Sequence, residues 1–192
     1  MAPIELLNTW ITEEQRAGAP NPLQAVLATC GKDAIPHARV VAIREIDERG
    51  LLFFTQKGTR KFNELISNPL ATITFWFELF QREVIIEGTT SLLPNADTQI
   101  YWNSYPREAQ IRFYSYAPTS SQPIANKDIL EEKRQQITQA YDAKTLPLSD
   151  YYCGFRLKPS RILFYAYRTD ELSDVFEYHP HNNTWRKQWL SP

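Results

Sequence analysis

Short runs of apolar residues, separated by turn residues, recur along most of the chain. Two of these runs, residues 23–29 and 35–43, flank a Gly31-Lys32-Asp33 turn and predict a β-hairpin. A second turn at residues 47–50 leads into a Leu- and Phe-rich run over residues 51–55, which predicts a third strand. The same criteria predict further strands over residues 70–79, 82–92, 152–157, 161–168, 175–178 and 184–189.

Four segments have the apolar spacing of helices instead. They cover residues 4–17, 57–68, 94–105 and 126–141. In the first of them Ile4, Leu7 and Trp10 share one face, and the second begins at Thr59. Residues 114–123, which are polar and contain proline, are predicted to form a loop that is longer than most connections.

The order of these elements indicates the fold class. About eight short strands, with helices inserted among them rather than alternating with them, favour an α+β fold built on an antiparallel β-barrel. A doubly wound parallel sheet is disfavoured, and the six glycines never form a Gly-rich dinucleotide fingerprint. The chain is predicted to be one domain, residues 1–192.

Composition narrows the class of protein further. The chain has 192 residues, with 21 Lys and Arg against 22 Asp and Glu, so its net charge of -1 disfavours a nucleic-acid binder. No apolar stretch approaches the roughly 18 residues that span a bilayer, and the first residues lack the pattern of a signal peptide. A soluble, cytoplasmic protein with no membrane partner is therefore expected.

Few residues are available for metal binding or nucleophilic catalysis. Cys30 and Cys153 are too few for a disulfide framework or a zinc cluster, and small core residues explain them better than nucleophiles do. Of the three histidines, His179 and His181 lie in a Pro/Asn turn, where exposed histidines are common. No metal site is predicted.

The basic residues are more informative. Arg39 and Arg44 flank an apolar strand, and Arg60-Lys61 stand at the start of the second predicted helix. A helix N-terminus offers unpaired backbone N–H groups and a positive dipole, and guanidinium groups suit phosphate oxygens. This pattern fits either a phosphate-binding cradle or a solvated basic helix start. Aromatic residues crowd residues 101–116 and 164–167, where they can form core or flank a planar ligand.

Several motifs, in order and along nearly the whole chain, resemble the pyridoxamine 5′-phosphate oxidase family. They are Arg39-x-x-x-x-Arg44, Gly50-x-x-Phe53-Phe54-Thr55, Gly58-Thr59-Arg60-Lys61, Arg82-x-Val84-x-x-x-Gly88, Tyr101-x-x-Ser104-x-Pro106-Arg107-x-x-Gln110-Ile111 and Gly154-Phe155-Arg156. The resemblance implies an FMN-binding split antiparallel β-barrel and a homodimer with FMN at the subunit interface. The C-terminal strands, about residues 151–192, would complete the barrel and the dimer region.

The family's cofactor-binding positions are carried over residue by residue. The resemblance implies FMN contacts at Arg39, Val40, Val41, Ala42, Ile43, Arg44, Phe54, Thr55, Arg60, Lys61, Glu83, Ser120, Ser121 and Tyr165. Among these, Arg39, Arg60 and Lys61 match the ligands of the FMN phosphate. Glu83 stands where the family has Gln, and Tyr165 where it has Trp near the flavin. Ser120 and Ser121 match a loop that the partner subunit supplies.

The substrate positions depart from the family. Arg44 and Tyr101 retain two of the groups that hold the substrate phosphate, but Tyr105 and Ala109 replace an Arg and a Ser. Near the C-terminus, residues 171–175 keep only the Asp of an Arg-x-His-Asp-Arg signature. The sequence therefore predicts an FMN-dependent oxidoreductase acting on another small substrate. The alternatives are a true pyridoxamine/pyridoxine 5′-phosphate oxidase with a rearranged site, and a non-catalytic FMN-binding module.

Overall fold

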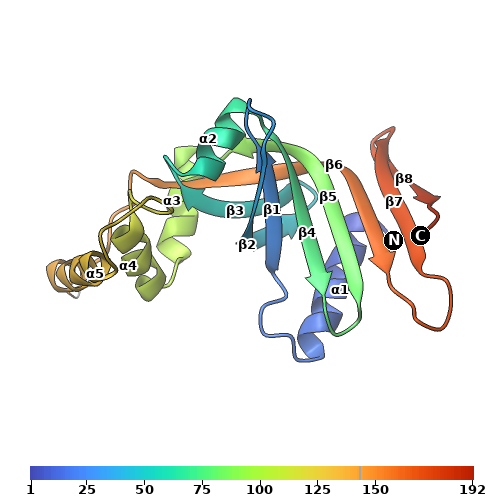
Figure 1. The fold of residues 1–192 in the computed structure, drawn as a ribbon, viewed down its shortest axis with the longest axis horizontal. Helices are drawn as coiled ribbons and strands as arrows, with labels where there is room; N and C mark the ends of the chain where they lie inside the picture. Colours follow the sequence, from blue (N-terminus) through green and yellow to red (C-terminus); the bar gives the residue numbers. More distant parts are fainter. Residues whose placement is uncertain (143) are drawn as a thin grey trace. The chain divides into compact units, whose positions relative to one another are not determined.

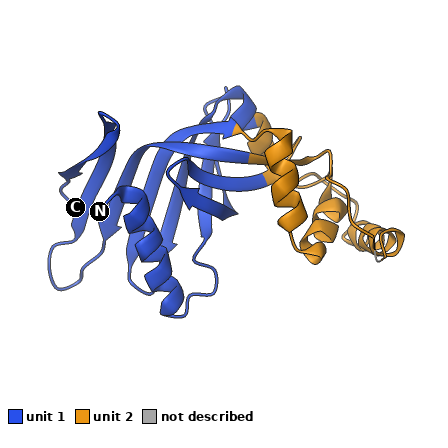
Figure 2. Cartoon of the chain, turned by 180° about the vertical axis from the view of Figure 1, so that it is seen from behind, with its two compact units in different colours: residues 1–54, 64–91, 155–192 blue, residues 55–63, 92–154 orange. Residues whose placement is uncertain are grey.

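The computed structural model describes residues 1–142 and 144–192, which divide into two compact units. Unit 1 comprises Met1–Phe54, Glu64–Ser91 and Phe155–Pro192, and unit 2 comprises Thr55–Asn63 and Leu92–Gly154 (Figure 2). The borders fall inside long elements, so three strands and one helix run from one unit into the other.

Unit 1 is built on an antiparallel sheet (Figure 1). Its strands are β1 (Gln24–Cys30), β2 (Pro36–Asp47), β3 (Gly50–Gln56), β4 (Leu70–Phe77), β5 (Arg82–Leu92), β6 (Tyr152–Ala166), β7 (Asp174–His181) and β8 (Thr184–Trp189). The order is β3-β2-β1-β4-β5-β6-β7-β8, and β3 also pairs with β6, so the first six strands close into a barrel. The predicted antiparallel barrel and its first hairpin are confirmed.

The barrel core follows from the alternation of apolar residues along the strands. On β4, Ile73, Phe75 and Phe77 are buried, whereas the intervening Trp76 is half exposed. The helix α1 (Pro3–Arg16) adds Leu7 and Trp10 to this core, and the Trp10 ring meets the Phe164 ring edge-on at 5.1 Å.

Unit 2 is mainly helical. It contains α3 (Asn95–Ser104), α4 (Arg107–Tyr116) and α5 (Asp128–Ala140), and α2 (Arg60–Ser67) begins in it. Trp102 is fully buried at its centre, where its ring contacts the Tyr152 ring at 4.9 Å and its Nε1 donates to the Leu146 carbonyl oxygen. In the described part of the chain, no helix is long and apolar enough to cross a membrane.

Two sequence predictions of local structure were wrong. Residues 114–123 are not wholly loop, because α4 extends to Tyr116. Two of the four buried residues of α4, Gln110 and Ser115, are polar, so the sequence does not show the apolar stripe that marks a helix. Residues 152–157 and 161–168 are not two strands but the single strand β6. Pro159 interrupts the sequence pattern, yet the pairing of β6 with β7 begins only at Ile162, so its missing N–H breaks no bond of that pairing.

We expect Gly50→Ala to destabilise the protein far more than Gly18→Ala. Both glycines have positive φ, which costs an alanine about 1–2 kcal/mol. A Cβ at Gly50 would lie 2.0 Å from the Leu157 carbonyl oxygen, whereas nothing lies within 4 Å of one at Gly18. Urea unfolding should show a loss of about 3 kcal/mol or more for Gly50→Ala. Equal losses for the two variants would contradict the close approach of β3 and β6.

Candidate functional site

The predicted cofactor strand β2 presents alternate residues to its two sides. Val41 and Ile43 are buried, while Val40, Ala42 and Arg44 are exposed. Only the outward set can offer side chains to a ligand, so Val41 and Ile43 can contribute backbone alone. The pairing of β2 with β3 shifts register between Ile43 and Glu45, which places Arg44 in a β-bulge. Bulges re-aim side chains and are frequent beside active sites.

Arg39 lies at the other end of this segment and is held by other side chains of unit 1. Its Nη1 donates to the Thr29 hydroxyl at 2.5 Å and to the Leu27 carbonyl oxygen at 3.3 Å. Its Nη2 lies 3.4 Å from a carboxylate oxygen of Glu64, a residue of α2 that is 8% exposed. The sequence analysis identified Arg39 but not Glu64. A glutamate within a helix is usually part of its exposed polar face, so the sequence alone gave no sign that Glu64 is buried.

In unit 2, two of the predicted cofactor residues, Thr55 and Ser120, lie at or beside the end of β3. Thr55 is buried, and its hydroxyl has no hydrogen-bond partner among the described residues. Its carbonyl oxygen lies 3.6 Å from Cys153 Sγ. The next residue, the buried Gln56, accepts a hydrogen bond from the Ser120 backbone N–H at 3.2 Å. One chain therefore places the loop that carries Ser120 beside the end of β3.

A tight turn then starts α2. The Thr59 N–H and hydroxyl both donate to the Gln56 carbonyl oxygen, and α2 begins at Arg60. Arg60 is exposed and Lys61 half-buried, and the first turn contains no acidic residue. Because the Thr59 hydroxyl donates to the Gln56 carbonyl oxygen, it does not cap the N–H groups of the first helical turn.

Cys153 is not suited to act as a nucleophile. Burial raises the pKa of its thiol to about 12, although the positive charges of Lys57 and Lys61 oppose the shift. The thiol is therefore protonated at neutral pH, in agreement with the prediction that this residue is part of the core.

Glu83 and Tyr165 belong to an aromatic cluster of unit 1, formed by Trp76, Tyr165 and Tyr167 around the Glu83 carboxylate. The Tyr165 and Tyr167 rings stack at 4.0 Å, and the Trp76 ring meets Tyr167 edge-on at 5.5 Å. The Tyr167 hydroxyl lies 3.5 Å from Glu83 Oε2. Burial, reinforced by the charge of Glu83, raises the pKa of the Tyr167 phenol, which stays neutral.

The residues at the predicted substrate positions differ from one another in burial and in their contacts. Tyr101, on α3, is half-buried. Tyr105 leans against the Trp102 ring at 6.4 Å, and Ala109 is buried on α4, so neither offers a cation. In unit 1, Arg168 is paired with Asp174 at 3.0 Å and with Glu171 at 3.6 Å.

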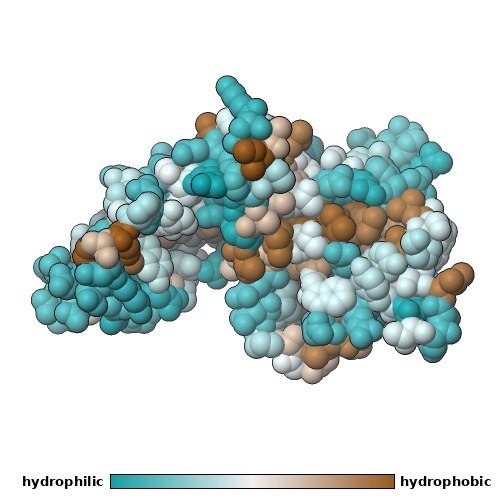
Figure 3. Space-filling model, in the orientation of Figure 1, coloured by the Kyte–Doolittle hydropathy of each residue, from teal (hydrophilic) through white to brown (hydrophobic). Residues whose placement is uncertain are grey.

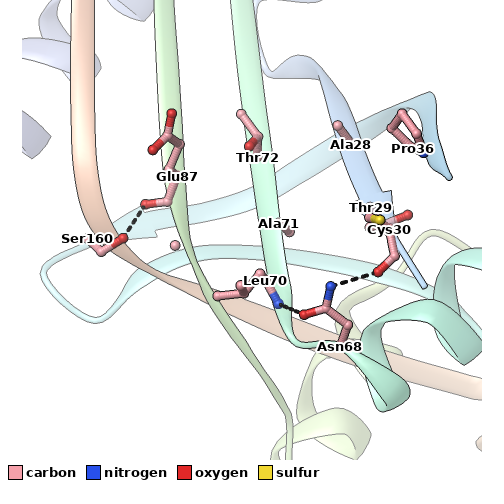
Figure 4. Close-up of a pocket in the computed structure, with 11 residues that line it drawn as sticks. Ala28, Thr29, Cys30, Pro36, Asn68, Leu70, Ala71, Thr72, Glu87 and Ser160 are labelled. Carbon is pink, nitrogen blue, oxygen red and sulfur yellow. Dashed lines mark hydrogen bonds between the residues drawn. The ribbon is translucent and has the colours of Figure 1, made fainter. Parts of the chain in front are cut away.

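A cavity of about 460 Å³ opens on the outside of the barrel between β1 and β4 (Figure 4). It is lined by Ala28, Thr29, Cys30, Pro36, Asn68, Leu70, Ala71, Thr72, Glu87, Gly88 and Ser160. None of the predicted cofactor residues lines it. Its polar groups bond to one another: Asn68 Nδ2 donates to the Cys30 carbonyl oxygen, and the Ser160 hydroxyl donates to the Glu87 carbonyl oxygen.

The outer face of β2, β1 and β4 is unusually apolar for a surface. Val40 on β2 is 62% exposed and lies opposite Val26 on β1, and Leu70 and Trp76 on β4 are also at least half exposed. Hydrophobic residues gather on this side of the barrel in Figure 3. An apolar area of this kind is typical of a surface that contacts another protein chain.

Sequence comparisons identify the family. Residues 11–164 match the family model of pyridoxamine 5′-phosphate oxidase. The chain belongs to the pyridoxamine 5′-phosphate oxidase family. Residues 152–192 also match the C-terminal dimerisation region of pyridoxine 5′-phosphate oxidase. This family member is 32% identical over 190 residues to the pyridoxine/pyridoxamine 5′-phosphate oxidase of a Cyanothece species, which covers 99% of this chain and 88% of that protein. It is 30% identical to the Zymomonas mobilis protein of the same name, with 99% and 98% covered.

Solved structures confirm the fold of this family member. PhzG from Burkholderia lata, in complex with tetrahydrophenazine-1-carboxylic acid, superposes with a TM-score of 0.88 at 24% identity, covering 100% of this chain and 93% of PhzG. A pyridoxamine 5′-phosphate oxidase-related, FMN-binding protein from Nostoc punctiforme superposes with a TM-score of 0.78 at 17% identity, covering 100% and 99%.

Proposed function

We propose that this protein binds FMN and is an FMN-dependent oxidoreductase. The observation that carries the proposal is the Thr55 hydroxyl, which is buried and has no partner among the described residues. A buried hydroxyl without a hydrogen bond costs about 1–3 kcal/mol, so such a group at a position predicted to bind a cofactor fits a missing ligand. The residues present therefore fit FMN.

Arg60 and Lys61 are the residues that would hold the FMN phosphate. They add two formal positive charges to a helix start whose first turn contains no acidic residue. When bound, FMN supplies the redox chemistry, accepting an electron pair from a donor placed against its ring. The chain's own contribution is to anchor the phosphate and to orient the donor.

The substrate of this oxidoreductase is proposed to be a small molecule other than a vitamin B6 phosphate. Tyr105 and Ala109 offer no positive charge, and Arg168 is already paired with two carboxylates. The names of the relatives favour the alternative, a true pyridoxine/pyridoxamine 5′-phosphate oxidase with a rearranged site. A non-catalytic FMN-binding module is the remaining possibility.

Anaerobic reduction of the FMN-loaded protein separates these functions. The panel of donors should contain pyridoxine 5′-phosphate, pyridoxamine 5′-phosphate, their unphosphorylated forms and tetrahydrophenazine-1-carboxylic acid, the last because PhzG was solved with it. Bleaching of the flavin absorption by an unphosphorylated donor supports the proposal. Bleaching by the phosphates alone supports the alternative, and a flavin that no donor reduces favours the binding module.

We further propose that the FMN site is completed by a second copy of the chain. The predicted residues lie on β2, β5 and β6, and the strands β1 and β4 stand between β2 and β5 in the sheet. At about 4.8 Å per strand, β2 and β5 lie about 14 Å apart along the sheet. We propose that a second subunit on the apolar outer face supplies the residues of β5 and β6 to the site that contains β2 of the first.

A homodimer is therefore expected in solution. Sedimentation equilibrium should give a particle of twice 22.4 kDa with FMN bound. Replacing Val26 and Val40, which are 42% and 62% exposed, with Lys should shift the particle toward monomer and weaken FMN binding together, because buried like charges are costly. A native particle of 22.4 kDa that is saturated with FMN would contradict the proposal.

A further inference from the structure

Glu64 joins three other side chains in a buried polar cluster of unit 1. Its carboxylate accepts a hydrogen bond from the Thr29 hydroxyl at 2.5 Å and lies 2.7 Å from His37 Nδ1. The same carboxylate lies 3.4 Å from Arg39 Nη2, and Arg39 also donates to Thr29. The cluster therefore ties β1 and β2 to α2 through a single carboxylate.

The charge of Arg39 is consequently balanced within the protein. The side chain of Glu64 is 9% exposed and that of Arg39 is 21% exposed, so water screens the pair only in part. Three of the guanidinium's contacts are taken by Glu64, Thr29 and the Leu27 carbonyl oxygen. Arg39 is thus held as a neutral pair with Glu64 and not as an isolated cation.

We infer that Glu64 is a positioning residue that limits the affinity of the protein for the FMN phosphate by neutralising Arg39. The inference rests on the proposed function and on the FMN phosphate contact that the family resemblance implies for Arg39. The Arg39–Glu64 pair then contributes little net charge to the phosphate affinity. Glu64 sets how tightly the cofactor is held without touching it.

The test is FMN and riboflavin binding to apoprotein, measured by flavin fluorescence at one pH and ionic strength. Glu64→Gln keeps an acceptor for Thr29 and Arg39 but removes the negative charge. We expect it to bind FMN about tenfold more tightly than the native protein, which corresponds to about 1.4 kcal/mol. Riboflavin lacks the phosphate, so its affinity should change by less than about threefold.

A double variant covers the case in which Glu64→Gln does not fold. Arg39→Met with Glu64→Gln removes both charges, so no buried charge is left unpaired. If the native pair is neutral toward the phosphate, this variant should bind FMN within about threefold of the native protein. A loss of more than tenfold in FMN affinity would show that Arg39 acts with its full charge and would overturn the inference.

Glu177→Gln is the matched control, because Glu177 is a buried carboxylate with the same kinds of partner. It lies 2.5 Å from Arg161 and 2.9 Å from His179, and none of the three is a predicted cofactor residue. Its ratio of FMN to riboflavin affinity should equal the native ratio. If the control binds FMN more tightly than the native protein, or if Glu64→Gln binds it no more tightly, the inference is overturned while the proposed function stands. Failure of the native protein to bind FMN overturns the proposed function as well.

Discussion

Replacing Arg60 and Lys61 with Ala is expected to weaken FMN binding by about 3–6 kcal/mol, which is roughly a hundredfold to more than ten-thousandfold in Kd. Each side chain is proposed to donate a charge-assisted hydrogen bond to the phosphate, and such bonds contribute about 1.5–3 kcal/mol each. The helix start itself stays intact in the variant, because the Thr59 N–H and hydroxyl bonds to Gln56 do not involve either side chain.

The control for this experiment is Arg16→Ala with Lys32→Ala. It removes the same formal charge from exposed positions of unit 1, on the last turn of α1 and in the β1–β2 hairpin. Isothermal titration should show FMN affinity close to native for the control. Riboflavin should bind the native protein far more weakly than FMN does. Equal FMN affinity for native protein and the Arg60/Lys61 variant would contradict the phosphate assignment.

The second large effect concerns the reaction for which the relatives are named. We expect the FMN-loaded protein to oxidise pyridoxine 5′-phosphate very poorly. By the family resemblance, Tyr105 and Ala109 replace two donors to the substrate phosphate, and Glu171 places a negative charge at the position of a cation. Two or three lost contacts correspond to about 3–9 kcal/mol, or about a hundredfold to a millionfold in kcat/KM.

Arg168 is a basic residue close in sequence to the lost signature. Its guanidinium is paired with Asp174 and Glu171 at the protein surface. A steady-state assay of pyridoxal 5′-phosphate formation, run beside the Cyanothece relative, measures the difference. A kcat/KM above about 10⁴ M⁻¹s⁻¹ would show that the substrate site had been rebuilt from other residues.

The barrel could be predicted from the sequence because its signals are local. Alternating apolar residues such as Ile73, Phe75 and Phe77 define which face of a strand is buried, and the Gly31-Lys32-Asp33 turn defines a hairpin. The helix α4 escaped prediction because Gln110 and Ser115 occupy its buried face. Their burial depends on tertiary contacts, such as the hydrogen bond from Gln110 Nε2 to the Trp102 carbonyl oxygen.

The sequence was enough to name residues of the candidate site but not to predict which side chains contact one another there. The basic residues near the start of α2 are visible in the sequence, and the family relationship is confirmed. Nothing in the sequence showed that Glu64 would turn inward onto Arg39, or that Gln56 would hold the Ser120 backbone. Both contacts join residues that are far apart in the sequence, and they depend on the tertiary arrangement of β3, α2 and the loops. The FMN contacts themselves stay a prediction.

The absorption spectrum of the purified protein after incubation with FMN and removal of free flavin tests the central claim most directly. We expect the fraction that contains the dimer to show a flavin spectrum that corresponds to one FMN for each chain. The bound flavin should be retained on dilution. A colourless protein that takes up no FMN would contradict the account, because Thr55, Arg60 and Lys61 would then hold no cofactor.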